Sequence, residues 1–416
     1  MMRFCIIRIA TITMNLRNYL VVGMAVAFSG FSAFGQRTNT PIQFSSGVGF
    51  VAPDSLFSLN FRFRTQLRAA YNTATLSDLS ASGIEARVRR LRLRFEGFVV
   101  DPRLTYYIQL SFSRGDMDWV DNEDSAINSS PNVIRDAVIH YKPNKRLTLS
   151  FGQTKLPGNR QRVNSSSQLQ FADRSIVNAT FNIDRDFGFQ ATFQKKFWGE
   201  AVYVLKGAVT SGEGRNAVFS DGGLAYTGRL ELLPFGPFTG KGDYLEGDLK
   251  REPSPKLSLA AGWHYNENAK RTAGTLGIDL FEDRNLKAFL ADFLLKYRGF
   301  AVSGEYVNRK ADNPITLNDQ LQERIIYAGA GKMLQLSYIF KNNVELAGRY
   351  AVITPHKSIQ RKLSQREETG VAITKYLNEH RVKLQGQIFY NLRKNPATVE
   401  ILQQNWTATF QVELGI

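Results

Sequence analysis

The chain has 416 residues, of which 43% are hydrophobic, and its 53 lysines and arginines exceed its 37 aspartates and glutamates, which gives a formal net charge of +16. The single cysteine, Cys5, lies near the start, so the rest of the chain holds no disulfide and no cysteine metal site. A balance this basic is typical of proteins that bind nucleic acid or anionic surfaces. We expect no nucleic acid partner, because the first segment predicts export.

Residues 1–35 have the organisation of a secretory signal peptide. Arginines precede an apolar run over residues 19–31, and a small-x-small triplet ends at Gly35. The run is too short and wrongly flanked for a transmembrane anchor, and no later stretch approaches the roughly 18 apolar residues of a spanning helix. We therefore expect residues 1–35 to be cleaved and residues 36–56 to form an N-terminal periplasmic segment.

Two runs between residues 59 and 99 alternate arginine with apolar side chains. A strand points successive side chains to opposite faces, so each run has one apolar and one cationic face. In a membrane barrel the apolar face meets lipid and the polar face lines a wet lumen, which here would attract anions. The cationic positions are Arg62, Arg64, Arg68, Arg90, Arg92 and Arg94, and the positions expected to face lipid in the first run are Leu59, Phe61, Phe63 and Leu67.

The second of these runs contains a change of phase. Ile84, Ala86 and Val88 occupy even positions, whereas the apolar residues from Leu91 onward occupy odd ones. One extra residue in a strand produces such a change, so the sequence predicts a β-bulge between the two parts.

Period-two alternation continues along the rest of the chain and predicts sixteen strands, an even number as in bacterial barrels. The alternating runs are 59–68, 91–99, 104–112, 137–141, 147–151, 189–193, 201–205, 224–232, 257–265, 289–297, 300–306, 325–340, 344–352, 366–377, 382–390 and 406–416.

The connections alternate between tight turns and long polar loops, as in outer-membrane barrels with short periplasmic turns and long outer loops. The long connections are 72–83, 115–131, 155–186, 212–221, 267–285, 311–322, 354–365 and 392–403. One joint departs from the rule, since residues 235–255 are long where a tight turn is expected.

A soluble β-sandwich is the alternative fold. It does not explain aromatic residues at strand ends on the apolar face, whereas interfacial girdles do. These aromatic residues are Trp263, Tyr265, Tyr297, Tyr350, Tyr390 and Trp406. We therefore expect an all-β fold, a transmembrane antiparallel β-barrel of about 16 strands over residues 57–416, surrounded by lipid and lipopolysaccharide in the bacterial outer membrane.

Three linked segments resemble the phosphate-selective porin O and P family, in its Bacteroidetes-type branch. They are Gly-Gln-x-Lys-x-Pro at 152–157, Asp-Arg-Ser at 173–175 and Arg-Asp-x-Gly at 185–188. The resemblance implies a homotrimeric, sixteen-stranded, anion-selective porin whose third outer loop folds into the lumen. In this chain that loop is 155–186, a length that is typical of functional loops.

The loop is basic, and we expect its cations to face the strand arginines across a constriction. They are Lys155, Arg160, Arg162, Arg174 and Arg185. An apolar patch of Leu169, Phe171 and Ile176 would pin the loop against the wall. Arg174 is the best single candidate for an anion contact, and the alternative is a structural pair with Asp173. An exposed lid with solvated charges is the other interpretation of the whole loop.

The remaining polar clusters predict no catalytic or metal site. The acidic run 116–124 lacks the glycine and closing glutamate of an EF-hand loop, and it is interpreted as a solvated outer loop. The four histidines have no ligand spacing, and no nucleophile-elbow pattern is present. The histidines are His140, His264, His356 and His380. We expect neither an enzyme nor a bound cofactor.

Together these patterns favour a water-filled diffusion channel for small anions, with phosphate or related oxyanions as the expected solutes. Arginine carries a permanent charge and a planar fork that suits phosphate oxygens, and several weak sites in series favour permeation over retention. A plugged binding or adhesion barrel without channel activity is one alternative, and a hydrolase built on a barrel scaffold is another.

Overall fold

The computed structural model describes residues 47–52, 56–113, 132–217 and 222–416, which belong to one compact unit, Ile42–Ile416. The predicted signal peptide and the acidic run 116–124 lie outside the described residues. Within these ranges, no helix has the length and apolar character needed to cross a membrane.

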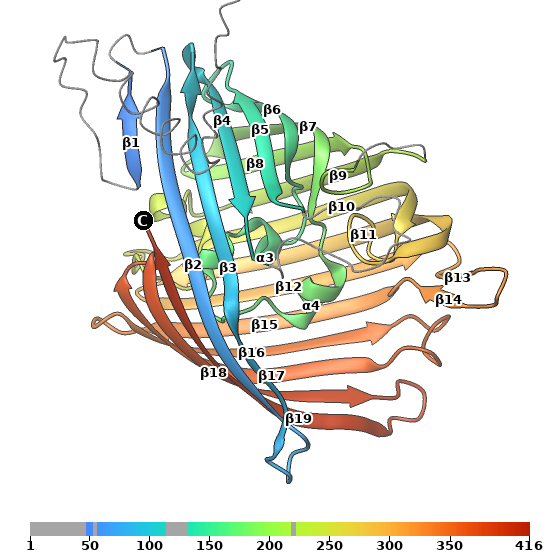
Figure 1. The fold of residues 1–416 in the computed structure, drawn as a ribbon. Coiled ribbons are helices and arrows are strands. Elements are labelled where there is room, and N and C mark those ends of the chain that lie inside the picture. The colour runs from blue at the N-terminus through green and yellow to red at the C-terminus, as the bar shows by residue number, and fades with distance from the viewer. Residues whose placement is uncertain (1–46, 53–55, 114–131, 218–221) are drawn as a thin grey trace, which may run out of the picture. The chain divides into compact units, whose positions relative to one another are not determined.

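Sixteen strands pair in sequence order and close into one antiparallel barrel, because β19 pairs with β2 (Figure 1). The barrel strands are β2 (Ser58–Thr73), β3 (Ala81–Val99), β4 (Asp101–Ser111), β5 (Ile134–Tyr141), β6 (Leu147–Lys155), β7 (Arg185–Trp198), β8 (Ala201–Thr210), β9 (Ala225–Leu233), β10 (Lys256–Arg271), β11 (Asp279–Tyr297), β12 (Phe300–Ala311), β15 (Gly329–Ile339), β16 (Val344–Pro355), β17 (Gln365–Asn378), β18 (Val382–Lys394) and β19 (Ile401–Gly415). Each overlaps one of the alternating runs, so the prediction of sixteen strands is confirmed.

Three short strands lie outside the ring. Strand β1 (Val48–Val51) pairs with β2 over Ser58 to Phe61, beyond the point where β19 ends alongside β2. Strands β13 (Ile315–Leu317) and β14 (Glu323–Ile325) form a hairpin in the connection between β12 and β15. Three or four residues are too few for a period-two pattern, which is why the sequence did not predict these strands.

The alternation in β2 separates a wet face from an outer face. Leu67 is 44% exposed, whereas its neighbours Gln66 and Arg68 are buried inside the barrel. Phe63 is exposed on the outer side as well. An apolar exterior around a polar interior reverses the arrangement of a soluble protein and matches a barrel in lipid.

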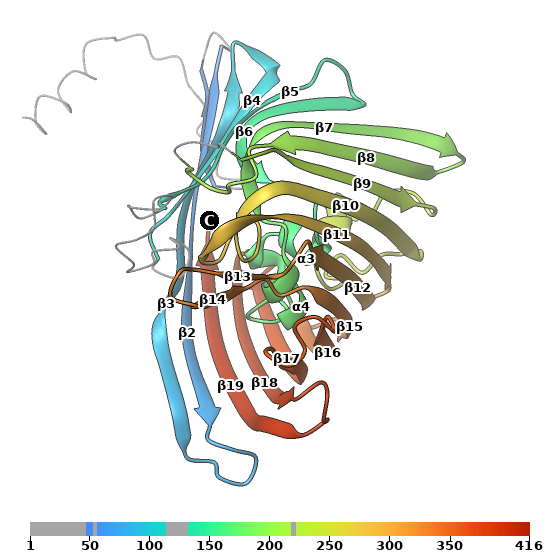
Figure 2. The same ribbon diagram turned by 90° about the vertical axis from the view of Figure 1, so that its right-hand side faces the viewer.

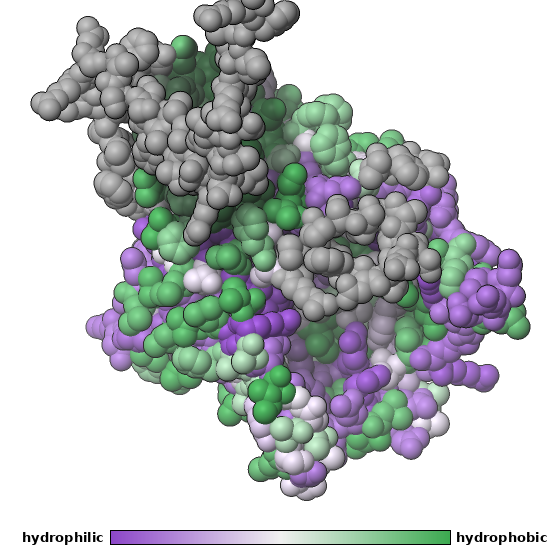
Figure 3. Space-filling model, viewed as in Figure 1, coloured by the Kyte–Doolittle hydropathy of each residue, from purple (hydrophilic) through white to green (hydrophobic). Residues whose placement is uncertain are grey.

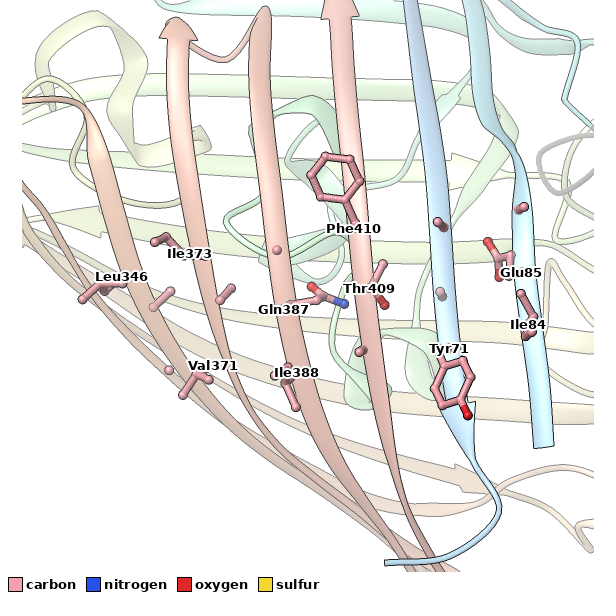
Figure 4. A pocket seen from close by; sticks show the side chains of 18 of the residues that line it. Tyr71, Ile84, Glu85, Leu346, Val371, Ile373, Gln387, Ile388, Thr409 and Phe410 are labelled. Atoms are coloured by element: carbon pink, nitrogen blue, oxygen red, sulfur yellow. The ribbon is translucent and has the colours of Figure 1, made fainter. Parts of the chain in front are cut away.

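An apolar groove runs across the outer face from β15 to β3 (Figure 4). Leu346, Val371 and Phe410 line one part of it, and Tyr71 and Ile84 line the other. All five side chains are exposed. Hydrophobic surface of this extent is costly in water and is stabilised by the acyl chains of a bilayer.

The predicted bulge is present in β3. Gln66 of β2 pairs with Arg90, but the next residue, Leu67, pairs with Val88. Arg89 is therefore the extra residue of the bulge and has no pairing partner in β2. The bulge moves the arginines on both sides of it onto the luminal face.

Short and long connections lie at opposite ends of the barrel, as predicted. We call the end with the tight connections the turn end and the other the loop end. The tight connections are 100, 142–146, 199–200, 298–299, 340–343 and 379–381. At the loop end, hydrophilic residues gather around β13 and β14, on the right of Figure 3. The connection 234–255, which contains the 3-10 helix η3 (Thr239–Tyr244), is the long exception at the turn end.

The core of the molecule lies inside the barrel and is built around the connection between β6 and β7. This connection forms α3 (Arg160–Val163), the 3-10 helix η2 (Ser166–Gln168) and α4 (Ile176–Phe181), and Figures 1 and 2 show α3 and α4 within the ring of strands. Val177 and Phe181 of α4 are fully buried against luminal side chains such as Leu290 and Ile353. The predicted inward fold of the third outer loop is confirmed.

Candidate functional site

Four arginines form a ladder on the luminal face of β2 and β3. Arg62 lies opposite Arg94 and Arg64 lies opposite Arg92 in the antiparallel register. Like charges directly opposite each other destabilise a strand pair, so this arrangement needs compensating partners or anions. Arg62 and Arg94 share one such partner, the carboxylate of Glu96, with Arg62 at 3.0 Å.

Ser166 joins the inward loop to the ladder. Its Oγ accepts hydrogen bonds from Nη2 of Arg64 at 2.8 Å and from Nη1 of Arg92 at 3.1 Å. Helix η2 holds this hydroxyl in place, because Ser165 and Gln168 form a capping box at its start. A neutral hydroxyl orients the two guanidiniums without adding negative charge beside them.

Asp173 places a carboxylate among three arginines that lie beyond the ladder, at the bulge. It pairs with Arg68 and lies 3.5 Å from both Arg89 and Arg90. Partial burial raises the pKa of Asp173, but Arg68, Arg90 and Arg89 outweigh it and hold the pKa well below the usual range. This carboxylate neutralises part of the charge beside the bulge and ties the loop to the wall.

The apolar patch that was expected to pin the loop lies against the wall. Leu169 and Phe171 are each 1% exposed, and the ring of Phe171 packs 5.3 Å from that of Phe389 on β18. The guanidinium of Arg349 lies 4.2 Å from the Phe171 ring centre. Ile176 packs at the edge of the cluster formed by α4. Hydrophobic burial of this kind stabilises the loop inside the barrel.

The five basic residues of the loop mostly hold the loop itself. Lys155 Nζ donates to the carbonyl of Val163 at 2.7 Å, and Arg174 donates to the carbonyl of Gln161 at 2.5 Å. The ion pairs of the other three are Arg160 with Asp292, Arg162 with Asp184, and Arg185 with Asp136.

This differs from the expectation that loop cations face the strand arginines. Ser166 is the loop residue that touches the ladder, and Asp173 pairs with Arg68 beyond it, while Arg160 reaches Asp292 on β11. The alternative role of Arg174, a structural pair with Asp173, is not formed either: Arg174 bonds loop carbonyls, and Asp173 lies against three strand arginines. Buried cations need counter-charges or carbonyls. The loop supplies them for Lys155, Arg162 and Arg174, whereas barrel strands supply Asp292 for Arg160 and Asp136 for Arg185.

A cavity of about 400 Å³ adjoins the ladder, on the side of the inward loop that faces the turn end of the barrel. Loop residues, turn residues and the end of β19 complete its lining. The charged residues in this lining are Arg62, Arg64, Arg92, Arg94, Lys250, Arg381, Glu379 and Glu413, so positive charge predominates. Side-chain exposure of 31% for Arg62 and 35% for Arg94 keeps these guanidiniums accessible to solvent. A low-dielectric wall with one sign of charge concentrates counter-ions.

Sequence reasoning missed several residues of this site. Ser166 lies in a Ser-x-x-Gln cap, a signal that predicts a helix start but not its contact with arginines. Lys250 and Arg381 belong to separate turns and come together only in the closed barrel. No local pattern records that proximity.

Comparison with known proteins agrees with this geometry. The phosphate-selective porin O and P family model matches residues 57–319. No curated protein matches the sequence. The outer membrane channel DcaP of Acinetobacter baumannii is similar in structure, with a TM-score of 0.54 and 10% identity, over 89% of this chain and 100% of that one.

Two further porins share the fold. The anion-selective porin from Comamonas acidovorans has a TM-score of 0.51 and 14% identity, and 86% of this chain and 100% of that chain are covered. OmpF of Salmonella typhi has a TM-score of 0.51 and 11% identity, with 88% and 99% covered. The family match spans more than half of the chain, so this protein belongs to the phosphate-selective porin O and P family and is an outer-membrane porin.

Proposed function

We propose that this porin is an anion-selective diffusion channel whose solutes are phosphate or related oxyanions. The observation that carries the proposal is the surplus of positive charge around the cavity. Its lining holds six lysine and arginine side chains, including the whole ladder, against two glutamates, Glu379 and Glu413. Glu413 lies 3.5 Å from Arg64, and Glu96 beside the cavity serves both Arg62 and Arg94.

The ladder suits permeation by several weak contacts in series. Arginine presents a planar fork to phosphate oxygens, and its charge does not titrate in the physiological range. Adjacent sites allow an anion to pass from one guanidinium pair to the next, and weak binding at each site allows it to leave. Arg68 and Arg90, with Asp173 between them, would continue this path toward the loop end. The five loop cations would act on anions mainly through their field, since each of them already bonds a carbonyl or a carboxylate of the protein.

Planar-bilayer recording tests the proposal. The purified porin should pass a current whose reversal potential in a KCl gradient reports preference for chloride, and added phosphate should reduce that current. Exchange of Arg64 and Arg92 for glutamine should weaken the phosphate effect. A folded barrel that passes no current would favour the plugged adhesion barrel instead, and ester hydrolysis by the pure protein would favour the hydrolase.

We also propose the setting in which the channel works. Residues 1–35 would be removed on export, and the barrel would assemble as a homotrimer in contact with lipid and lipopolysaccharide. The apolar outer face supports the lipid contact, and the trimer is what the resemblance to the family implies. Mass determination of the exported chain and sedimentation in detergent test the two points separately.

A further inference from the structure

The connection 234–255 enters the barrel from the turn end, where every other connection between described strands is tight. Nζ of Lys296, a luminal residue of β11, donates to the carbonyls of Gly242 at 2.8 Å and Leu245 at 2.9 Å. The hydroxyl of Tyr244 donates to Glu231 on the luminal face of β9 at 2.9 Å. These contacts hold the middle of the connection inside the lumen.

The same connection docks on the inward loop. Glu246, which is 5% exposed, accepts hydrogen bonds from Nε2 of Gln161 and from the backbone N–H of Gln170, both at 3.0 Å. Its own backbone N–H donates to the carbonyl of Gln168 at 3.0 Å. Arg160 Nη1 donates to the carbonyl of Asp243 at 2.7 Å. The loop and the turn therefore form one joined structure inside the barrel.

Gly247 shows how closely the turn approaches the wall. Its φ is +66°, and a Cβ added there would lie 2.4 Å from Oε1 of Glu345 on β16. Glycine adopts this conformation without strain, and any larger residue would have to displace the buried carboxylate of Glu345. The turn therefore packs directly against β16.

Residues of the turn complete the cavity at the arginine ladder. Gly240, Leu245 and Lys250 line it together with the four ladder arginines. Lys250 also pairs with Glu379 at 2.6 Å, and 39% of its side chain remains exposed. Lys241 is exposed in the same turn but is absent from the cavity lining.

We propose that residues 238–250 form a second constriction element. This element narrows the lumen from the turn end and confines permeating ions to the side of the lumen that carries the arginine ladder. Lys250 is then a further residue that contacts the permeating ion. The Lys250 assignment rests on the proposed anion channel, whereas the narrowing does not depend on the sign of the ion. Confinement matters because the field of an exposed charge decays within about 10 Å at 0.1 M salt, so ions that crossed an open lumen far from the arginines would feel only a screened charge.

Two variants test the proposal in planar bilayers. The first replaces residues 239–247 by a short Gly-Ser linker, and its single-channel conductance should rise by about twofold or more as the path widens. Resistance of the folded barrel to dissociation by detergent before heating identifies refolded protein. Unchanged conductance of the refolded barrel would overturn the narrowing.

The second test compares K250E with K241E, which make the same charge change in the same turn. At about 0.1 M KCl, K250E should shift the reversal potential toward cations and K241E should not, and the shift should shrink near 1 M because the Debye length falls to about 3 Å. Equal shifts, or none from K250E, would overturn the assignment of Lys250. If the parent channel has no anion preference, the proposed function is contradicted. The conductance of the variant with the shortened turn still tests whether residues 238–250 narrow the lumen.

Discussion

Arg64 on β2 and Ser166 on the inward loop meet in the lumen, where Nη2 of the arginine donates to Oγ of the serine at 2.8 Å. The same oxygen accepts from Arg92, so one hydroxyl joins two strands to the loop. S166A should leave the two guanidiniums without this acceptor. We expect weaker phosphate block with little change in conductance, because the guanidiniums lose orientation while the path keeps its width. Block that is unaltered in S166A would show that the serine does not position them.

The sign of the ladder should set the sign of the permeating ion. Glutamate at Arg62, Arg64, Arg92 and Arg94 should turn an anion-preferring channel toward cations, since luminal charge concentrates counter-ions. The reversal potential in a KCl gradient measures this. Arg103, whose side chain is exposed at the turn end beside Asp101, provides the control exchange, R103E. A folded quadruple variant with the parent's reversal potential would mean that ions do not pass the ladder.

Removal of the inward loop should open the channel. Deletion of most of residues 159–180 should raise conductance and weaken phosphate block, because the deleted segment carries both the helices in the lumen and Ser166. Conductance and phosphate block are measured on deletion variants that still fold into barrels. If conductance and block both stay at the parent's values, the strands alone select the ion.

The carboxylate of Asp173 should stabilise the folded channel and lower the positive charge of its lumen. D173N should strengthen anion preference, because one luminal carboxylate is lost. Since 42% of the Asp173 side chain is exposed, we expect its pairs to contribute only about 1 kcal/mol to the free energy of unfolding.

The pH dependence of that contribution follows from the pKa of Asp173. Because the folded-state pKa is depressed, the stabilisation is fully present above the unfolded pKa of about 3.9 and is lost as pH falls through the folded pKa. Urea titrations of the parent and D173N in detergent should therefore differ at neutral pH and converge in strong acid. A difference that grows on acidification would contradict the depressed pKa.

Glu246 should lock the turn to the loop. E246A leaves the buried donors of Gln161 and Gln170 without an acceptor, which should lower the free energy of unfolding by about 1–3 kcal/mol. We also expect larger fluctuations in the open-channel current, because the two inward segments lose their junction. E246Q, which retains a carbonyl oxygen, is the matched control and should have a smaller effect. Equal and small effects of both variants would mean that the junction carries little energy.

The strand framework was predictable because its signal is local. Alternation of apolar and polar residues fixes which face of β2 meets lipid, and the change of phase between Val88 and Leu91 predicted a bulge between them, which the strand register places at Arg89. The barrel end at which each connection lies was also predictable, because successive connections of an antiparallel barrel lie at alternate ends and here alternate between short and long.

The interior of the barrel was less predictable because its contacts join distant residues. The sequence indicated that Phe171 is a buried anchor, but not that Asp173 would pair with Arg68 on β2. The unusual length of residues 235–255 was visible, yet nothing local indicates that Glu246 meets Gln170. Such pairings depend on barrel closure, which places residues from many strands around one space.

The most direct test of the account is the reversal potential of the parent channel in a KCl gradient, measured before and after phosphate is added to one side. We predict a potential that reports preference for chloride, and a chloride current that falls as phosphate occupies the ladder at Arg62, Arg64, Arg92 and Arg94. A channel that prefers potassium, or whose chloride current is indifferent to phosphate, would contradict the central claim that these arginines form the anion path.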